Sequence, residues 1–198
     1  MYVVIEGMEL QNKVIPIGRI KAKVLDLMDR VGQKVQVNTI EEGLTVSDEW
    51  DTWFERVLDF ARDRAELSPL IKDEYYTDIT ISLGSYYYDL VYFGCNQERK
   101  SFIRVVNQFI PEPDQIIFLQ APFNELTLQI TQDYYKVLPL NVRLIHAQEM
   151  SEEETVHLIA LHILLEWLTR YQPEYDPNKL LQEYEKYVNH KKIEVNYE

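Results

Sequence analysis

A glycine and a lysine near the N-terminus have the spacing of a phosphate-binding loop. Gly7 ends a short apolar run, and Lys13 precedes an amphipathic segment. In such a loop, backbone N–H groups and a lysine surround phosphate oxygens. The full motif is Gly-x-x-x-x-Gly-Lys-[Ser/Thr], but Asn12 stands at the second glycine and Val14 at the hydroxyl position. The pair therefore fits either a rewritten phosphate loop or an ordinary turn between a strand and a helix.

Strand-like and helix-like patterns alternate along the rest of the chain. Short apolar or alternating runs predict five strands, at residues 2–5, 34–38, 78–83, 115–120 and 141–146. Apolar residues at helical spacing predict helices at residues 17–31, 47–65, 102–109 and 151–170, with a last helix capped by Asp176. This alternation predicts a three-layer α/β domain with a five-stranded, mostly parallel sheet flanked by helices.

Two of the predicted helices begin with recognisable capping residues. Ser47 is a suitable N-cap for the second, whose stripe we expect to form part of the core. Ser151 and Glu154 form a capping box at the start of the long fourth helix. The expected core stripe of the second helix consists of Trp50, Trp53, Phe54, Val57, Leu58, Ala61 and Ala65.

The composition limits the classes of function. The 198 residues carry a formal net charge of −13, which argues against a general nucleic-acid or anionic-membrane surface. Cys95 is the single cysteine, so we expect neither an intrachain disulfide nor a cysteine metal site, and a reducing cytoplasm. No run of about 18 apolar residues predicts a membrane span. His157 and His162 lie five residues apart and do not share a helix face, so no metal site is predicted.

The opening MYVVIEGMELQNKV resembles that of the thymidylate kinases, which read M-Y-hydrophobic-V-I-E-G-x-D/E-G-x-G-K-S/T. The resemblance places Glu9 at the loop carboxylate and Lys13 at the phosphate-binding lysine. Gly7 keeps its place, whereas Leu10, Asn12 and Val14 depart from the motif, so the loop is degenerate. The resemblance implies a P-loop nucleoside-monophosphate-kinase-like fold.

Two further blocks resemble the substrate-binding parts of that family. Glu41 lies in TIEEGLT, which is similar to a T-R-E-P-G-G-T segment that reaches the substrate phosphate; Ile40 replaces its arginine. Residues 58–72, LDFARDRAELSPLIK, are similar to F-A-A-D-R-A-x-H. There the resemblance implies that Phe60 stacks on the base and Arg64 pairs with the phosphate. The alternative is a buried aromatic residue beside a salt-bridged arginine.

Other parts of the sequence differ more strongly from the thymidylate kinase motifs. YYYDLVYFG resembles Y-x-S-S-x-A-Y-Q-G, so Tyr92 keeps its place while Asp89 and Phe93 replace the residues that would read the base. An Asp–Arg pair of the reaction centre would fall at Leu83 and Gly84 and is absent. The resemblance continues through residues 113–130, but only ITQDYYKVLP then precedes the fifth strand, so the arginine-bearing lid is absent. We expect a thymidylate-kinase-like domain at 1–170 and a linker with a helical extension at 171–198.

These departures favour a catalytically silent pseudo-kinase with at most weak binding of a nucleoside monophosphate. Phosphoryl transfer depends on positioning and charge neutralisation. For this task Lys13, Arg64, Glu9 and Glu41 persist, and Lys13 and Glu9 are the catalytic remnants. One alternative is an active nucleoside monophosphate kinase that uses ATP, Mg²⁺ and substitute residues such as Arg19, Lys21 or Lys23. Another is a purely structural or regulatory dimer subunit. The family implies a homodimer, and pairing with an active kinase is a further expectation.

Overall fold

The computed structural model of the protein describes residues 1–7, 15–41, 52–72, 78–120, 125–139, 142–146, 150–176 and 178. The strands are β1 (Tyr2–Gly7), β2 (Val37–Glu41), β3 (Ile79–Leu83), β4 (Gln115–Gln120) and β5 (Val142–His146). The helices of the described ranges are α2 (Ile17–Arg30), α3 (Trp53–Lys72), α4 (Tyr86–Tyr92), α5 (Gln97–Val106), α6 (Glu125–Val137) and α7 (Glu152–Tyr171).

The five strands form one sheet in the order β2-β3-β1-β4-β5, and every neighbouring pair is parallel. β1 therefore lies in the middle, and the chain crosses over it on the way from β3 to β4. The carboxyl ends of all five strands meet at one edge of the sheet. In open α/β sheets, ligands bind outside this edge, where the strand order reverses.

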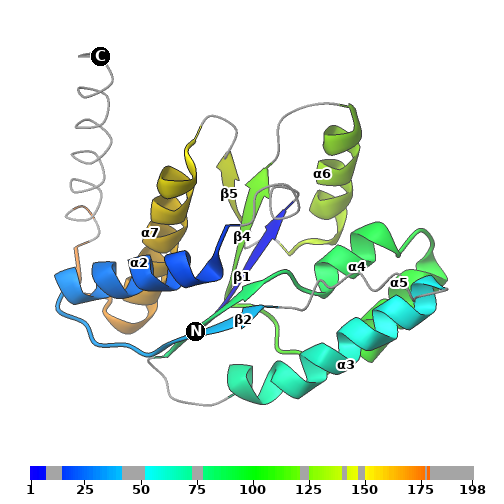
Figure 1. Ribbon diagram of the computed structural model, residues 1–198, viewed down its shortest axis with the longest axis horizontal. Helices are drawn as coiled ribbons and strands as arrows, with labels where there is room; N and C mark the ends of the chain where they lie inside the picture. Colours follow the sequence, from blue (N-terminus) through cyan, green and yellow to red (C-terminus); the bar gives the residue numbers. More distant parts are fainter. Residues whose placement is uncertain are drawn as a thin grey trace.

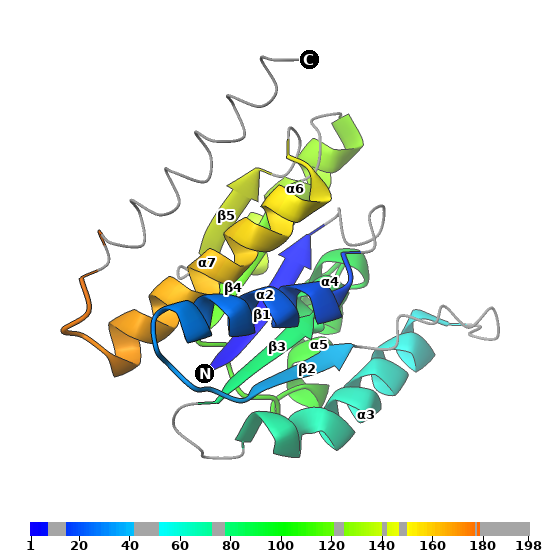
Figure 2. The ribbon, with the colours of Figure 1, turned by 60° about the vertical axis from the view of Figure 1, so that its left-hand side comes forward.

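Helices cover both faces of the sheet, as Figures 1 and 2 show. On one face α2 and α7 lie side by side over a large apolar cluster, which contains the fully buried Trp167. On the other face, residues of α3, α4 and α5 pack over a second, smaller cluster around Val4 and Ile116 of the sheet. The three layers predicted from the alternating pattern are confirmed, and the sheet is wholly parallel.

Most predicted elements lie where the pattern placed them, but one strand and one helix are shifted. The predicted strand at 34–38 begins later, at Val37, because pairing with β3 starts only where Val37 faces Ile79. The residues from Lys34 to Gln36 alternate, but they form a partly exposed lead-in. The short helix expected at 102–109 is α5, which begins earlier and ends at Val106.

The predicted core stripe of α3 is wrong in part. Phe54 and Leu58 are 43% and 39% exposed, whereas Val57 and Ala61 of the same stripe are buried. The buried face also includes Phe60, Arg64 and Ser68, so it is rotated from the most apolar stripe. The predicted N-cap Ser47 and the stripe residue Trp50 lie outside the described residues.

The start of α7 is confirmed in detail. The Ser151 hydroxyl accepts the backbone N–H of Glu154 at 3.2 Å, and the Glu154 carboxylate accepts the backbone N–H of Ser151 at 2.7 Å. Two donors of the first turn are thereby satisfied. Farther on, the Asp176 carboxylate accepts the N–H of Asn178 at 3.0 Å, as an N-cap does. The helix expected beyond it lies outside the described residues.

Candidate functional site

Gly7 ends β1 at the carboxyl edge of the sheet, and packing explains why it is a glycine. Its φ is +131°, and a Cβ placed there would lie 2.1 Å from the carbonyl oxygen of Leu119 in β4. A side chain would collide with the neighbouring strand. The glycine is therefore needed by the sheet itself, whether or not a phosphate approaches the loop that follows.

The central contact of this region joins α3 to α4. The Arg64 guanidinium Nη1 lies 2.6 Å from the Asp89 carboxylate Oδ2, and the two side chains are 5% and 0% exposed. The same Nη1 donates to Asn107 Oδ1 at 3.2 Å. The Asn107 amide in turn donates to the carbonyl of Ile103 at 2.9 Å, which fixes its orientation. Two residues predicted to bind substrate thus bind each other.

Aromatic residues of α3, α4 and α6 surround this part of the molecule. The Arg64 guanidinium carbon lies 5.8 Å from the centroid of the buried Phe60 ring, one helical turn earlier. Tyr92 stacks on Tyr88 at 4.3 Å and meets the edge of Tyr134 at 6.5 Å. The predicted Phe60–Arg64 neighbourhood exists, but Phe60 is only 6% exposed.

A buried carboxylate that the sequence did not single out lies at the end of β1. Glu6 is 1% exposed and accepts a hydrogen bond from the hydroxyl of Ser85. Ser85 is also the N-cap of α4, since its oxygen accepts the N–H of Tyr87 at 3.2 Å. Burial, and then the nearby Glu6, hold the pKa of the Tyr134 hydroxyl well above its usual range, so that tyrosine stays a neutral donor.

The sequence offered a partial signal for these additional residues. A serine directly before YYYDLVY is a helix N-cap signal, and α4 could have been read from it. Glu6 stands in an apolar strand, where a carboxylate must find a partner. Asn107 carries no comparable signal, because it acts only as the C-cap of α5 that faces Arg64.

Of the other predicted site residues, Glu41 lies at the end of a strand. Glu9, Asn12 and Lys13 lie outside the described residues. Glu41 is the last residue of β2 and pairs with Leu83 of β3, so its backbone reaches the same edge as Gly7. Within the described ranges, no three side chains of His, Cys, Asp and Glu come together as metal ligands.

His157 contributes to packing in α7. It is buried at 6% exposure, and burial lowers its pKa from 6.5 to about 4. The nearby Lys23 and Arg30 act in the same direction, while Asp26 opposes them. His157 is therefore a neutral core residue at physiological pH, on the face opposite the ion pair.

Chemically, the described edge holds a guanidinium that is already neutralised. A phosphate that approached Arg64 would have to displace the Asp89 carboxylate or share the guanidinium with it. Sharing would bring like charges together away from water, and displacement would take the guanidinium away from a buried carboxylate. This arrangement disfavours an incoming anion at Arg64.

The structure is similar to solved structures of thymidylate kinases. A thymidylate kinase from Ehrlichia chaffeensis matches with a TM-score of 0.58 and 18% identity, over 83% of this chain and 98% of that one. The thymidylate kinase from Candida albicans, an enzyme of broad substrate specificity, matches with a TM-score of 0.53 and 14% identity. That match covers 86% of this chain and 92% of the other.

The fold is thymidylate-kinase-like. No family model matches the sequence, and no curated protein matches it. At these identities the likeness concerns the fold alone. Within this thymidylate-kinase-like fold, the described site consists of Gly7, Glu6, Phe60 and the Arg64–Asp89 pair at the carboxyl edge of the sheet.

Proposed function

We propose that the protein is a catalytically silent thymidylate-kinase-like protein, a pseudo-kinase that binds a nucleoside monophosphate weakly at most and acts through protein contacts. The observation that carries this proposal is the buried ion pair of Arg64 with Asp89, at 2.6 Å. Arg64 stands where the family resemblance places the arginine that pairs with the substrate phosphate. A carboxylate of the same chain occupies its guanidinium.

The degenerate loop and the absent lid support the same conclusion. Asn12 puts a side chain where backbone would approach phosphate, and Val14 offers no oxygen to Mg²⁺. Removing one good charge-stabilising donor typically lowers a rate by about 10²–10³. The combined loss of loop, lid and strand-end charges would therefore abolish efficient transfer, even though such losses are not additive.

A coupled phosphoryl-transfer assay tests the proposal. With ATP–Mg²⁺ and dTMP, or with other nucleoside monophosphates, we expect no turnover above background. Turnover near about 1 s⁻¹, the lower end of the usual kinase range, would contradict it. Lys13→Ala serves as the control, because loss of any activity in that variant would locate the active site at this loop. Calorimetric titration with ATP–Mg²⁺ should likewise show no micromolar binding.

The active-kinase alternative has less support from α2. Arg19 is paired with Glu152 of α7, and Lys23 lies 3.4 Å from Asp26 on its own helix. Both side chains therefore already have carboxylate partners. ATP and Mg²⁺ enter only under this alternative, and the residues that would hold them in the loop include Lys13.

The dimer-subunit alternative is favoured by an exposed apolar patch on α3 and α5. Phe54 stacks on Phe102 with ring centroids 4.8 Å apart, and Trp53 meets the edge of Phe102 at 5.9 Å. Leu58 is 39% exposed and Val105 is 59% exposed. Contiguous exposed apolar residues on two helices mark an interaction surface. We propose that a second copy of this chain covers this patch.

Light scattering after size-exclusion chromatography tests that surface. The wild-type protein should elute as a dimer, and Val105→Asp should yield monomers, because a charge would be buried at the interface. Leu25→Asp is the matched control, since Leu25 is 38% exposed on α2 at the other face. A monomeric wild type, or equal effects of both variants, would contradict the assignment.

A further inference from the structure

A pocket lies beside α4 and α5, on the face of the sheet that these helices cover. It has a volume of about 430 Å³ and is lined by residues of α4, α5, the segment before β4 and the end of α6. Pro113 precedes the start of β4, and Val137 and Pro139 precede β5. The walls of the pocket therefore come from the first turn of α4, from α5 and from the segments that lead into β4 and β5.

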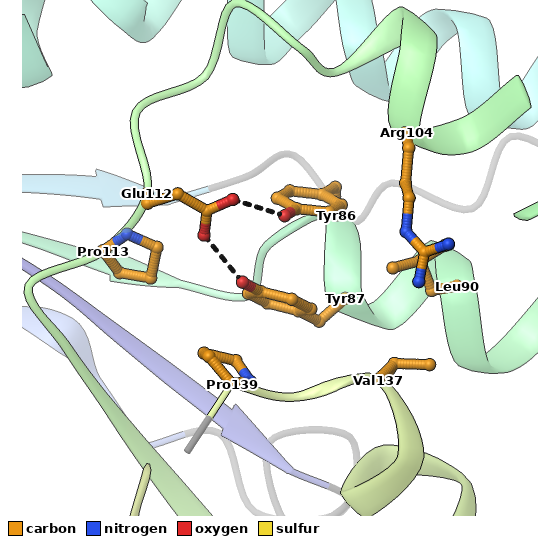
Figure 3. A pocket seen from close by; sticks show the side chains of 8 residues that line it. All are labelled: Tyr86, Tyr87, Leu90, Arg104, Glu112, Pro113, Val137 and Pro139. Atoms are coloured by element: carbon orange, nitrogen blue, oxygen red, sulfur yellow. Dashed lines mark hydrogen bonds between the residues drawn. The ribbon is translucent and has the colours of Figure 1, made fainter. Parts of the chain in front are cut away.

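One end of this pocket carries a carboxylate held by two phenols. The Tyr87 hydroxyl donates to Glu112 Oε2 at 2.8 Å, and the Tyr86 hydroxyl donates to Oε1 at 3.1 Å (Figure 3). The two tyrosine rings stack with centroids 4.5 Å apart. Burial, together with the hydrogen bonds to Glu112, raises the pKa of both phenols. They therefore remain donors and fix the carboxylate in place.

The pocket also contains a cation that is separate from this carboxylate. Arg104 of α5 lines it, and Figure 3 shows its guanidinium beside Leu90, across the pocket from Glu112. Within the described residues, neither Arg104 nor Glu112 has an ion-pair partner, although both line one pocket. Leu90, Pro113, Val137 and Pro139 supply apolar walls.

From this arrangement we infer a binding site for a small zwitterion, a free amino acid with an apolar side chain. Its carboxylate would pair with the Arg104 guanidinium, whose planar fork suits a carboxylate. Its ammonium group would pair with Glu112, which keeps free lone pairs beyond the two that the phenols occupy, and with the faces of the tyrosine rings. Its side chain would cover Val137 and the prolines. This inference does not depend on the kinase-like site.

The opposite charges of Arg104 and Glu112 favour a zwitterionic ligand over one that carries a single charge. A simple amine would leave Arg104 without a partner and would be repelled by it. A simple carboxylic acid would leave Glu112 without a partner and would likewise be repelled. A ligand that carries both charges can pair with both ends at once, and a pocket of about 430 Å³ lies within the usual range of small-molecule sites.

Ligand titration followed by NMR or calorimetry on the full chain tests this site. Leucine should bind, whereas isoamylamine and 4-methylpentanoate, each of which lacks one charge, should bind at least about tenfold more weakly, the equivalent of about 1.4 kcal/mol. Arg104→Gln and Glu112→Gln should each weaken leucine binding by a similar factor. Glu98→Gln, an exposed carboxylate of α5 that does not line the pocket, is the matched control and should leave binding unchanged.

Several outcomes would overturn the inference. These are no leucine binding at about 10 mM, a concentration that would reveal even weak affinity, equal binding of the amine or the acid alone, and binding that survives both variants. Should Glu112→Gln fail to fold, Arg104→Gln alone decides between these outcomes, because Arg104 is exposed and its loss leaves no buried group unpaired.

Discussion

Two arginine–aspartate pairs of nearly equal length hold this molecule in different ways. Arg64 and Asp89 lie 2.6 Å apart at 5% and 0% exposure, beneath the carboxyl edge of the sheet. Arg170 and Asp114 lie 2.7 Å apart at 37% and 35% exposure, at the amino edge. The comparison shows that burial, and not contact distance, decides what a charged pair does. The exposed pair can be broken and rehydrated, whereas the buried pair cannot.

The neighbours of the two pairs reinforce this contrast. Asp114 also accepts the N–H of Tyr2 at 2.7 Å, and Arg170 donates to Glu166 at 2.8 Å, so each member has other partners in reach of water. Arg64 contacts Asp89 and Asn107 where all three side chains are buried. Water can replace a lost partner only at the amino edge.

The largest effect should follow from breaking the buried pair. Arg64→Ala removes the guanidinium from a fully buried carboxylate, so we expect a loss of about 3–5 kcal/mol in the free energy of unfolding. Denaturant titration measures this loss. Arg62→Ala is the matched control, because Arg62 is two residues away on α3 with its side chain 64% exposed, and we expect almost no change. Similar small losses in both variants would refute the contrast.

Removing both charges should cost much less than removing one. In Arg64→Met with Asp89→Leu, no charge stays buried, and apolar replacements of a buried pair are often neutral or stabilising. We therefore expect the double variant to be more stable than either single one, by an amount that a double-mutant cycle reports. Simple addition of the two single losses would mean that the side chains act independently.

The free energy of unfolding should depend on pH through His157 of α7, which lies on the other face of the sheet from the buried pair. The His157 pKa is about 4 in the folded protein, against 6.5 for an ordinary histidine, so the unfolded chain takes up the proton first. Its contribution to stability is complete above pH 6.5 and is lost as the pH falls from 6.5 toward 4. In His157→Gln the unfolding free energy should vary less over this window. An unchanged pH dependence would assign the titration to other groups.

The smallest effect should come from the exposed pair. For Arg170→Ala we expect a loss of at most about 1 kcal/mol, because both side chains reach water, and about 1 M salt should reduce the difference from wild type further. Thermal unfolding at low and high salt checks this. A loss as large as that of Arg64→Ala would show that exposure does not separate the two pairs.

The fold could be predicted from the sequence because its signals are local. Gly32, with φ of +73°, ends the first helix where expected, and Ser151 with Glu154 begins the last described one. Alternation of apolar strands with amphipathic helices then leaves few arrangements besides a parallel sheet covered on both faces.

The site was harder to predict because its contacts are not local. Arg64 and Asp89 are 25 positions apart, and the sequence placed both at a substrate without indicating that they would pair. Periodicity also favoured Phe54 and Leu58 as core because they are more apolar than Arg64 and Ser68. A paired arginine can be buried while phenylalanine stays at the surface, and hydrophobic pattern alone does not encode that exchange.

The most direct test of the account is a titration of dTMP into wild type, Asp89→Asn, and Asp89→Asn combined with Arg64→Ala, with folding checked by circular dichroism. Asparagine keeps the shape and one acceptor but removes the charge that competes with phosphate. We predict millimolar or weaker binding by wild type, binding at least about tenfold tighter in Asp89→Asn, and its loss in the double variant. Micromolar binding by wild type that is unchanged in Asp89→Asn would contradict the claim that Asp89 excludes the phosphate from Arg64.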